Sequence, residues 1–487
     1  MNEEKELSSP SGTLTFRDGT LLLHFPEENT PLPEVLAHLF VRDERVHAYR
    51  SNAYNYAAIL RIAHYCGMSL EDKARDYTIP ELKLHTRFEI RPHQKRALEA
   101  WKNNKCRGIV EMPTGSGKSF LAVLAMASVN RSTLVVVPTI DLMLQWERNL
   151  RDFFQKEIGL LGGGSHEVKE ITVATYDSAA LQMGRIGNRF GLVIFDECHH
   201  LPGEVNSIAA SSAIAPYRLG LSATPEREDG KDSLSGKLLG KIVCRIHIDE
   251  LEGSILSPYI TKRISIKLTP EEEEAYQKER SVYLSFVKHH HIDFSRPGAW
   301  QEFIALAARA PGGREAMKAY LAQRRIARYP ESKEKTVWEL LRKHAGERIL
   351  VFTAENEAAY SMGERFCLPV ITHQTKSSER KDFLDKFRSG IYPVLLTSKV
   401  LNEGVDVPEA SIGIVVSGSG STREHVQRLG RILRAKEGKQ ALLYELISAG
   451  TSEINVSERR RRHRAYGASP IPRREELGGE EEMDDAY

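Results

Sequence analysis

The residues best suited to chemistry lie in a glycine-rich segment, PTGSGKS at 113–119, between the strand-like run GIVEM at 108–112 and the helix-prone run FLAVLAMA. A loop between a strand and a helix N-terminus directs backbone N–H groups and the positive end of the helix dipole toward phosphate oxygens. In such a loop Lys118 reaches the β and γ phosphates and the Ser119 hydroxyl ligates Mg²⁺. The strict GxxxxGK[ST] pattern has glycine where this chain has Met112. The expected nucleotide-binding residues here are Thr114, Gly115, Ser116, Gly117, Lys118 and Ser119.

Two adjacent carboxylates end a second apolar run, LVIF at 192–195. A carboxylate at the carboxyl end of a strand can hold Mg²⁺, and its neighbour can orient and deprotonate an attacking water, so we assign these roles to Asp196 and Glu197. The pair could instead cap a helix. Cys198 has no basic partner that would make it a nucleophile, and the two histidines at 199–200 lack the i, i+4 spacing typical of zinc ligands.

A run of basic side chains, QRLGRILR at 427–434, could complete such a site. Hydrolysis builds negative charge on the γ-phosphoryl oxygens, and a guanidinium supplied across a cleft stabilises this charge when the cleft closes. Arg428 and Arg431 are the candidates for this role, and Gln427 beside them is a further candidate catalytic residue. Considered alone, the same run would be interpreted as an exposed basic helix.

The composition is that of an ordinary globular protein of about three structural units. Among 487 residues, 68 basic side chains nearly balance 66 acidic ones, for a net charge of +2, and 41% are apolar. Any nucleic-acid affinity must therefore come from local patches rather than from overall charge. The five cysteines are far apart and form no CxxC pair, and no apolar run is long enough to cross a bilayer. We expect a cytosolic protein without a membrane partner.

Two series of short Val-, Ile- and Leu-rich runs alternate with helix-prone segments, which predicts two α/β lobes with mainly parallel sheets. The first series is 108–112, 133–137, 171–174, 192–196 and 218–222, and the second is 348–353, 369–372, 392–397, 412–417 and 441–446.

Three other segments differ from the lobes in composition. Before them, SGTLTFRDGTLLLHF predicts a hairpin that turns at Asp18-Gly19. Between the two series, residues 270–345 are highly charged and helix-prone, as in an insertion. At the end, the basic run at 457–464 and the acidic run at 480–485 have little to bury and predict a flexible tail.

Taken together and in this order, these elements resemble the motif set of superfamily 2 helicases and translocases. Further segments that match the set are Arg91 with Gln94, Pro138-Thr139, Thr175-Tyr176-Asp177, Ser222-Ala223-Thr224, 350–353 and 397–406. The narrower resemblance is to the XPB family in its short prokaryotic or archaeal form. It rests on Arg227-Glu228-Asp229, which directly follows the Ser-Ala-Thr segment as the RED motif does in XPB proteins, and it covers about residues 35–457.

The resemblance implies two RecA-like lobes, a small N-terminal α+β domain and a helical thumb-like insertion. The implied boundaries are 1–85 for a DNA-damage-recognition-like domain, 86–250 for lobe 1, 251–457 for lobe 2 with the thumb at about 270–330, and 458–487 for the tail. It also implies adenine recognition by Arg91 and Gln94, nucleotide contacts from Gly404 and Asp406, and coupling to DNA through Ser222, Thr224 and the triplet Arg227, Glu228 and Asp229.

The implied activity is ATP- and Mg²⁺-dependent translocation on DNA with 3′ to 5′ polarity, opening duplexes in nucleotide excision repair with a nuclease partner in a prokaryotic, nucleoid-associated setting. Three alternatives stay open. The chain could be an RNA-directed ATPase of the same superfamily, a branch-migration translocase, or a scaffold that uses ATP as a switch to recruit a nuclease. The hydrolytic set of Glu197 and the two cleft arginines argues against a pure switch.

Overall fold

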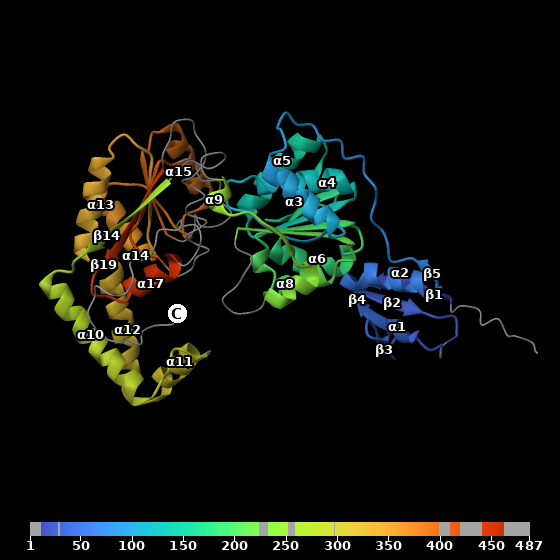
Figure 1. Ribbon diagram of the computed structural model, residues 1–487, viewed down its shortest axis with the longest axis horizontal. Helices are drawn as coiled ribbons and strands as arrows, with labels where there is room; N and C mark the ends of the chain where they lie inside the picture. Colours follow the sequence, from blue (N-terminus) through green and yellow to red (C-terminus); the bar gives the residue numbers. More distant parts are fainter. Residues whose placement is uncertain are drawn as a thin grey trace, which may run out of the picture. The chain divides into compact units, whose positions relative to one another are not determined.

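The computed structural model describes residues 11–27, 30–223, 232–251, 259–296, 298–398, 410–418 and 441–461. It consists of two compact units (Figure 1). Unit 1 comprises Met1–Pro113 and Gly117–Ile246, and unit 2 comprises Thr114–Ser116 and His247–Tyr487. The N-terminal sheet and the first parallel sheet therefore belong to the same unit.

The N-terminal sheet is five-stranded in the described part of unit 1, in the order β3-β4-β2-β1-β5. Asp18 and Gly19 join its first two strands, and both have positive φ, 49° and 76°, the geometry of a tight hairpin turn. The predicted hairpin is confirmed. A Cβ on Gly19 would also come within 2.7 Å of the Ser212 hydroxyl oxygen, so this turn requires glycine for space as well as for φ. The elements are β1 Ser11–Arg17, β2 Thr20–His24, α1 Glu34–Ala37, β3 Val41–Asp43, β4 Ala48–Asn52, η1 Ala53–Asn55, α2 Tyr56–Tyr65 and β5 Ser69–Asp72.

Main-chain hydrogen bonds attach this sheet to the rest of unit 1. The Gly19 amide donates to the Gly184 carbonyl at 3.1 Å, and the Asp76 amide donates to the Asn188 carbonyl, also at 3.1 Å. The side chain of Ile214 packs into the core of the N-terminal sheet. Polar and apolar contacts thus fix the sheet to its neighbour.

The described residues of unit 1 also form an eight-stranded sheet in the order β13-β6-β12-β11-β7-β10-β8-β9. Its registered pairs are parallel except β8 with β9. Helices cover both faces, α3 to α5 on one side and α6 and α8 on the other (Figure 1). The strands are β6 Arg107–Glu111, β7 Thr133–Val137, β8 Ile158–Gly162, β9 Ser165–His166, β10 Ile171–Thr175, β11 Leu192–Asp196, β12 Tyr217–Ser222 and β13 Ile242–Arg245. The helices are α3 Pro92–Asn103, α4 Lys118–Val129, α5 Ile140–Phe154, α6 Tyr176–Ile186, η2 Cys198–His200, α7 Asn206–Ser211 and α8 Asp232–Leu239.

All residues of β7, β10 and β11 are buried, which explains their continuous apolar sequences. The five strands predicted for this lobe are confirmed, each within a residue or so at its ends. Strands β8, β9 and β13 were not predicted. Each is short or lies toward an edge of the sheet, where the sequence pattern is weakest.

The described part of unit 2 is built on a six-stranded parallel sheet in the order β14-β19-β18-β15-β17-β16. The second predicted series of strands is confirmed, and β14, which precedes the insertion, is an addition. The strands are β14 Tyr259–Ile266, β15 Ile349–Phe352, β16 Val370–Ile371, β17 Val394–Thr397, β18 Ile412–Val415 and β19 Ala441–Ser448. The helices outside the insertion are α9 Ile248–Leu251, α13 Glu331–Lys343, α14 Asn356–Phe366, α15 Ser377–Ser389 and α17 Glu453–Arg461. Helix α17 runs to Arg461 and so crosses residue 458, where the tail was expected to begin; Ser457, within this helix, is buried.

Three helices form the insertion between β14 and α13: α10 Pro270–His289, α11 Ala299–Arg309 and α12 Gly313–Arg328. Thr269 caps α10 by accepting a hydrogen bond from the Glu272 amide, while the Glu272 carboxylate accepts one from the Thr269 amide. An aromatic cluster of Tyr283, Trp300, Phe303 and Tyr320 joins the three helices. The insertion therefore has an apolar core of its own.

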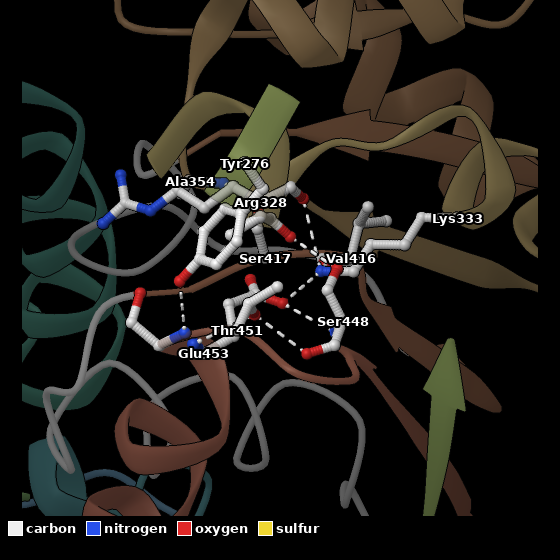
Figure 2. Close-up of polar contacts among 11 residues, drawn as sticks. Tyr276, Arg328, Lys333, Ala354, Val416, Ser417, Ser448, Thr451 and Glu453 are labelled. Atoms are coloured by element: carbon white, nitrogen blue, oxygen red, sulfur yellow. Dashed lines mark hydrogen bonds and ion pairs between the residues drawn. The ribbon is translucent and has the colours of Figure 1, made fainter. Parts of the chain in front are cut away.

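A buried lysine joins the base of the insertion to the second sheet (Figure 2). The side chain of Lys333 is fully buried, and its ammonium donates to the Glu453 carboxylate, to the Val416 carbonyl at 2.8 Å and to the Arg328 carbonyl at 3.3 Å. The Ser452 amide donates to the Tyr276 hydroxyl of α10 at 3.0 Å. Helices α10, α13 and α17 thus meet at the carboxyl ends of β18 and β19.

Candidate nucleotide site

The predicted phosphate-binding loop follows β6 and leads into α4, which begins at Lys118. Gly115 and Gly117 have φ values of 84° and 91°, a backbone region that favours glycine. The Gln94 side-chain amide nitrogen donates to the Gly117 carbonyl at 3.2 Å, and a Cβ on Gly117 would overlap this nitrogen. The loop end is therefore held by a side chain from α3 and admits only glycine at this position.

Gln94 is held in turn by the start of its own helix. Its Oε1 accepts a hydrogen bond from the Arg91 amide at 3.1 Å, and Pro92 fills the first position of α3. The Gln94 side chain is buried. The oxygen and the nitrogen of the Gln94 side-chain amide both form hydrogen bonds within the protein, so Gln94 positions the loop. Gln94 is also one of the two residues for which the resemblance implies adenine recognition.

Asp196 ends β11 and is only 6% exposed. Its Oδ2 accepts a hydrogen bond from the Trp146 indole N–H at 2.9 Å, and its Oδ1 accepts one from the Glu197 amide at 3.0 Å. The Tyr176 hydroxyl donates to the Asp196 carbonyl at 3.1 Å. Burial, with the charge of Glu197, raises the pKa of Asp196 to about 6, while Lys118 and the Trp146 hydrogen bond act in the opposite direction.

Glu197 adopts a left-handed backbone conformation, with φ of 46°, directly after the strand. Its Oε1 lies 3.4 Å from the Lys118 ammonium, and its Oε2 lies 3.5 Å from His199 Nδ1. A non-glycine residue in this conformation costs energy and is common at functional sites. The sequence-predicted pair of acidic residues is thus brought to the predicted lysine.

The residues present fit a magnesium nucleotide. Oxygen ligands such as the Asp196 carboxylate and the Ser119 hydroxyl are those that Mg²⁺ prefers. Lys118 begins α4, so its amide lies at the positive end of a 12-residue helix. The Thr114 hydroxyl in the loop is buried and has no hydrogen-bond partner among the described residues. A bound phosphate or a water molecule could complete a buried hydroxyl of this kind.

His199 links the acidic pair to the next motif. Its Nδ1 lies 3.1 Å from the hydroxyl oxygen of Ser222, the last residue of β12, and both side chains are buried. One imidazole ring therefore contacts both Ser222 and Glu197. Burial raises the pKa of the neighbouring Cys198 thiol, which makes that cysteine a poor nucleophile.

Several sequence-predicted residues lie outside the described residues. They are Thr224, Arg227, Glu228, Asp229, Gly404, Asp406, Gln427, Arg428 and Arg431.

All five cysteines lie within the described ranges and none forms a disulfide. In the same ranges no group of three or more His, Cys, Asp or Glu side chains could hold a metal ion. Nor does any described helix combine the length and apolar character needed to cross a membrane.

Sequence reasoning missed Trp146. The indole touches the predicted metal ligand from α5, 50 residues earlier in the chain. From the sequence one can expect that a tryptophan on the apolar face of a helix beside a parallel sheet is buried and that its indole N–H has an acceptor. The sequence does not indicate which residue provides that acceptor.

Three family models match the chain. "Xeroderma pigmentosum group B helicase damage recognition domain" matches residues 14–74, "Type III restriction enzyme, res subunit" matches 87–227, and "ERCC3/RAD25/XPB C-terminal helicase" matches 325–466. The last two models cover the nucleotide site and most of the second lobe, and the first covers the N-terminal sheet.

Curated relatives and solved structures agree with these matches. The DNA 3′-5′ translocase XPB2 of Sulfurisphaera tokodaii is 39% identical over 86% of this chain and 94% of its own length. The DNA 3′-5′ helicase XPB of Mycobacterium tuberculosis is 29% identical over 77% of this chain, which spans 63% of that relative. The Hef helicase domain of Pyrococcus furiosus has the same fold, with a TM-score of 0.52, 17% identity and coverage of 76% of this chain and 98% of that domain. The chain belongs to the XPB family of DNA helicases and translocases.

Proposed function

We propose that this protein is an ATP-driven DNA translocase that moves 3′ to 5′ and opens duplex DNA in nucleotide excision repair. The observation that carries the proposal is the joining of Lys118, Asp196 and Glu197 at the carboxyl edge of the first parallel sheet, in a chain of the XPB family. In open α/β sheets this edge is where nucleotides bind.

In this proposal the chain's own residues divide the work of hydrolysis. The loop amides and Lys118 hold the phosphates, while Ser119 and Asp196 hold Mg²⁺, which would neutralise charge on the phosphates when bound. Glu197 orients and deprotonates the attacking water; until nucleotide arrives, Lys118 occupies one of its oxygens at 3.4 Å. Arg428 and Arg431 supply positive charge from the second lobe, with Gln427 as a further, uncharged candidate beside them, and Gly404 and Asp406 complete the nucleotide contacts.

Coupling to DNA is assigned to the segment that begins at Ser222. The His199 contact gives Glu197 a physical connection to this segment, which continues through Thr224 to the triplet 227–229. We assign the strand-opening role to Arg227, Glu228 and Asp229 together with the helical insertion α10–α12 as the thumb. Residues 1–85 would recognise damaged DNA, and the tail at 458–487 would add a weak, salt-sensitive DNA contact. A nuclease partner and a nucleoid location complete the proposal.

Displacement of a triplex strand from duplex DNA tests translocation, and a forked duplex tests strand opening. We expect the wild-type chain to do both with ATP and Mg²⁺, and the Glu197→Gln variant to bind nucleotide but do neither. Ala substitution of all three residues at 227–229 should abolish fork opening while triplex displacement persists. Displacement by Glu197→Gln at the wild-type rate would remove the assigned base, and fork opening by the triple variant would remove the triplet from strand separation.

A further inference from the structure

Trp146 occupies an unusual position for a core tryptophan. It lies in the middle of α5, whose N-terminus is capped by the Thr139 hydroxyl accepting from the Leu142 amide at 3.2 Å. The Trp146 side chain is 1% exposed. Its indole N–H donates at 2.9 Å to Oδ2 of Asp196, the carboxylate assigned to Mg²⁺. An uncharged donor thus meets a buried anionic acceptor.

A second buried tryptophan of the same unit shows what packing alone requires. Trp101 in α3 is also 1% exposed, and its indole N–H donates at 2.9 Å to the main-chain carbonyl of Arg218. Any carbonyl would satisfy such an indole. Trp146 differs from Trp101 in its acceptor. The indole of Trp146 donates to a side-chain oxygen of Asp196, and the direction of that oxygen depends on the rotamer of Asp196.

Two N–H groups fix the Asp196 carboxylate, one on each oxygen. The Glu197 amide holds Oδ1 at 3.0 Å, but this donor belongs to the next residue and would follow Asp196 if the strand end moved. Trp146 belongs to another element, so its N–H sets the carboxylate plane relative to the sheet. Each oxygen keeps one lone-pair direction for a metal ion or a metal-bound water.

We propose that Trp146 is a positioning residue for the metal: its indole N–H holds the Asp196 carboxylate in the orientation that binds Mg²⁺ together with nucleotide. The proposal deepens the proposed function and rests on it, because it takes Asp196 as the metal ligand. Groups that orient a metal ligand commonly change metal affinity about 10- to 100-fold when removed.

Replacing Trp146 by Phe keeps an aromatic ring in the core and removes only the donor side of the indole, and Trp101→Phe is the matched control. The measurement is equilibrium binding of a fluorescent ADP analogue at rising Mg²⁺, with thermal unfolding of each variant. We expect W146F to raise the Mg²⁺ midpoint about tenfold or more. We expect W101F to leave the midpoint within about twofold of the wild type while it also loses thermal stability, because both substitutions remove one buried hydrogen bond. Binding without Mg²⁺ should be equal in all three proteins.

The binding data distinguish a failure of the positioning role of Trp146 from a failure of the nucleotide site itself. If the wild type binds with a clear Mg²⁺ dependence and W146F has the same midpoint as W101F, the positioning role is wrong and the nucleotide site stands. If the wild type shows no Mg²⁺ dependence, both are wrong.

A spectroscopic measurement on the wild type covers the case in which W146F does not fold. The four tryptophans give four indole N–H signals in an NMR spectrum of nitrogen-15-labelled protein. W101F, Trp300→Phe and Trp338→Phe assign the Trp146 signal by elimination. Addition of Mg²⁺ with ADP should shift the Trp146 signal more than the Trp101 signal, and an equal shift would overturn the proposal.

Discussion

Lys333 in unit 2 and Asp196 in unit 1 are both buried charged side chains, and their surroundings differ. In unit 2, Lys333 gives its three protons to the Glu453 carboxylate and to two main-chain carbonyls (Figure 2). In unit 1, Asp196 receives two neutral N–H donors and lies beside a second carboxylate, Glu197, so that its pKa rises. The protein supplies Lys333 with a counter-ion and two further hydrogen-bond acceptors, whereas it supplies the Asp196 carboxylate with two neutral donors and a neighbouring negative charge. In the proposed function the Asp196 carboxylate binds a cation, which would complete its pairing, whereas the paired Lys333 joins α13 to α17.

The largest effect on stability should come from breaking the pair in unit 2. Lys333→Met leaves Glu453 buried without its counter-ion, which should lower the free energy of unfolding of unit 2 by about 3–5 kcal/mol. Urea unfolding followed by circular dichroism measures the change. The double variant K333M/E453M removes both charges and should recover most of the loss. A double variant as unstable as K333M would show that the charge pair is not what stabilises this junction.

Asp196→Asn keeps the side-chain shape and one oxygen for the Trp146 N–H. It gives up the acceptor of the Glu197 amide, but it also removes a poorly compensated buried charge, whose cost is the larger of the two. We expect the ligand-free protein to be at least as stable as the wild type and up to about 2 kcal/mol more stable, while Mg²⁺-dependent nucleotide binding is lost. Thermal unfolding and binding of the fluorescent ADP analogue measure the two properties. Marked destabilisation at pH 7–8 would contradict the comparison between the two buried charges.

The difference in stability between D196N and the wild type should depend on pH. The pKa of Asp196 is raised in the folded state, to about 6, so the unfolded chain loses this proton first as pH rises. The ionised carboxylate therefore favours unfolding increasingly between about pH 4 and 6, and this penalty is complete above pH 6. The stability advantage of D196N over the wild type should grow across this window and then stay constant. A constant advantage from pH 4 to 8 would mean that Asp196 does not titrate there.

Proton competition predicts a related change in binding. Because Mg²⁺ requires the ionised carboxylate, Mg²⁺-dependent binding of the ADP analogue by the wild type should weaken as pH falls through about 6. Titrations at pH 5, 6 and 8 measure this effect. A midpoint that is unchanged between pH 8 and 5 would argue that Asp196 is not a metal ligand.

The smallest effect should come from an exposed pair on the same helix as Lys333. Lys335 and Glu331 lie 3.1 Å apart on α13, with side chains 64% and 53% exposed. Lys335→Met should change the free energy of unfolding by no more than about 0.5 kcal/mol, because water solvates both partners. Urea unfolding alongside K333M provides the measurement, and a loss comparable to that of K333M would remove burial as the explanation.

Much of the fold was predictable because buried parallel strands leave continuous apolar runs, as at 133–137 and 192–196. The phosphate loop and acidic pair were predictable because their chemistry depends on order along the chain and on the strand or helix beside them. Contacts between distant elements were not. Trp146 meets Asp196 through packing of a helix on a strand, and Lys333 meets Glu453 through packing of two separate helices. Sequence spacing does not encode these partners, since many acceptors would satisfy either side chain.

Steady-state ATP hydrolysis is the decisive measurement. It is made without nucleic acid, with single-stranded DNA, with duplex or forked DNA and with RNA, and Glu197→Gln is the blank. We expect Mg²⁺-dependent hydrolysis that DNA stimulates strongly and RNA weakly, and that falls about 10²- to 10⁴-fold in the Glu197→Gln variant. Stimulation mainly by RNA would overturn the assignment to DNA, and hydrolysis by Glu197→Gln at the wild-type rate would overturn the assignment of the catalytic base.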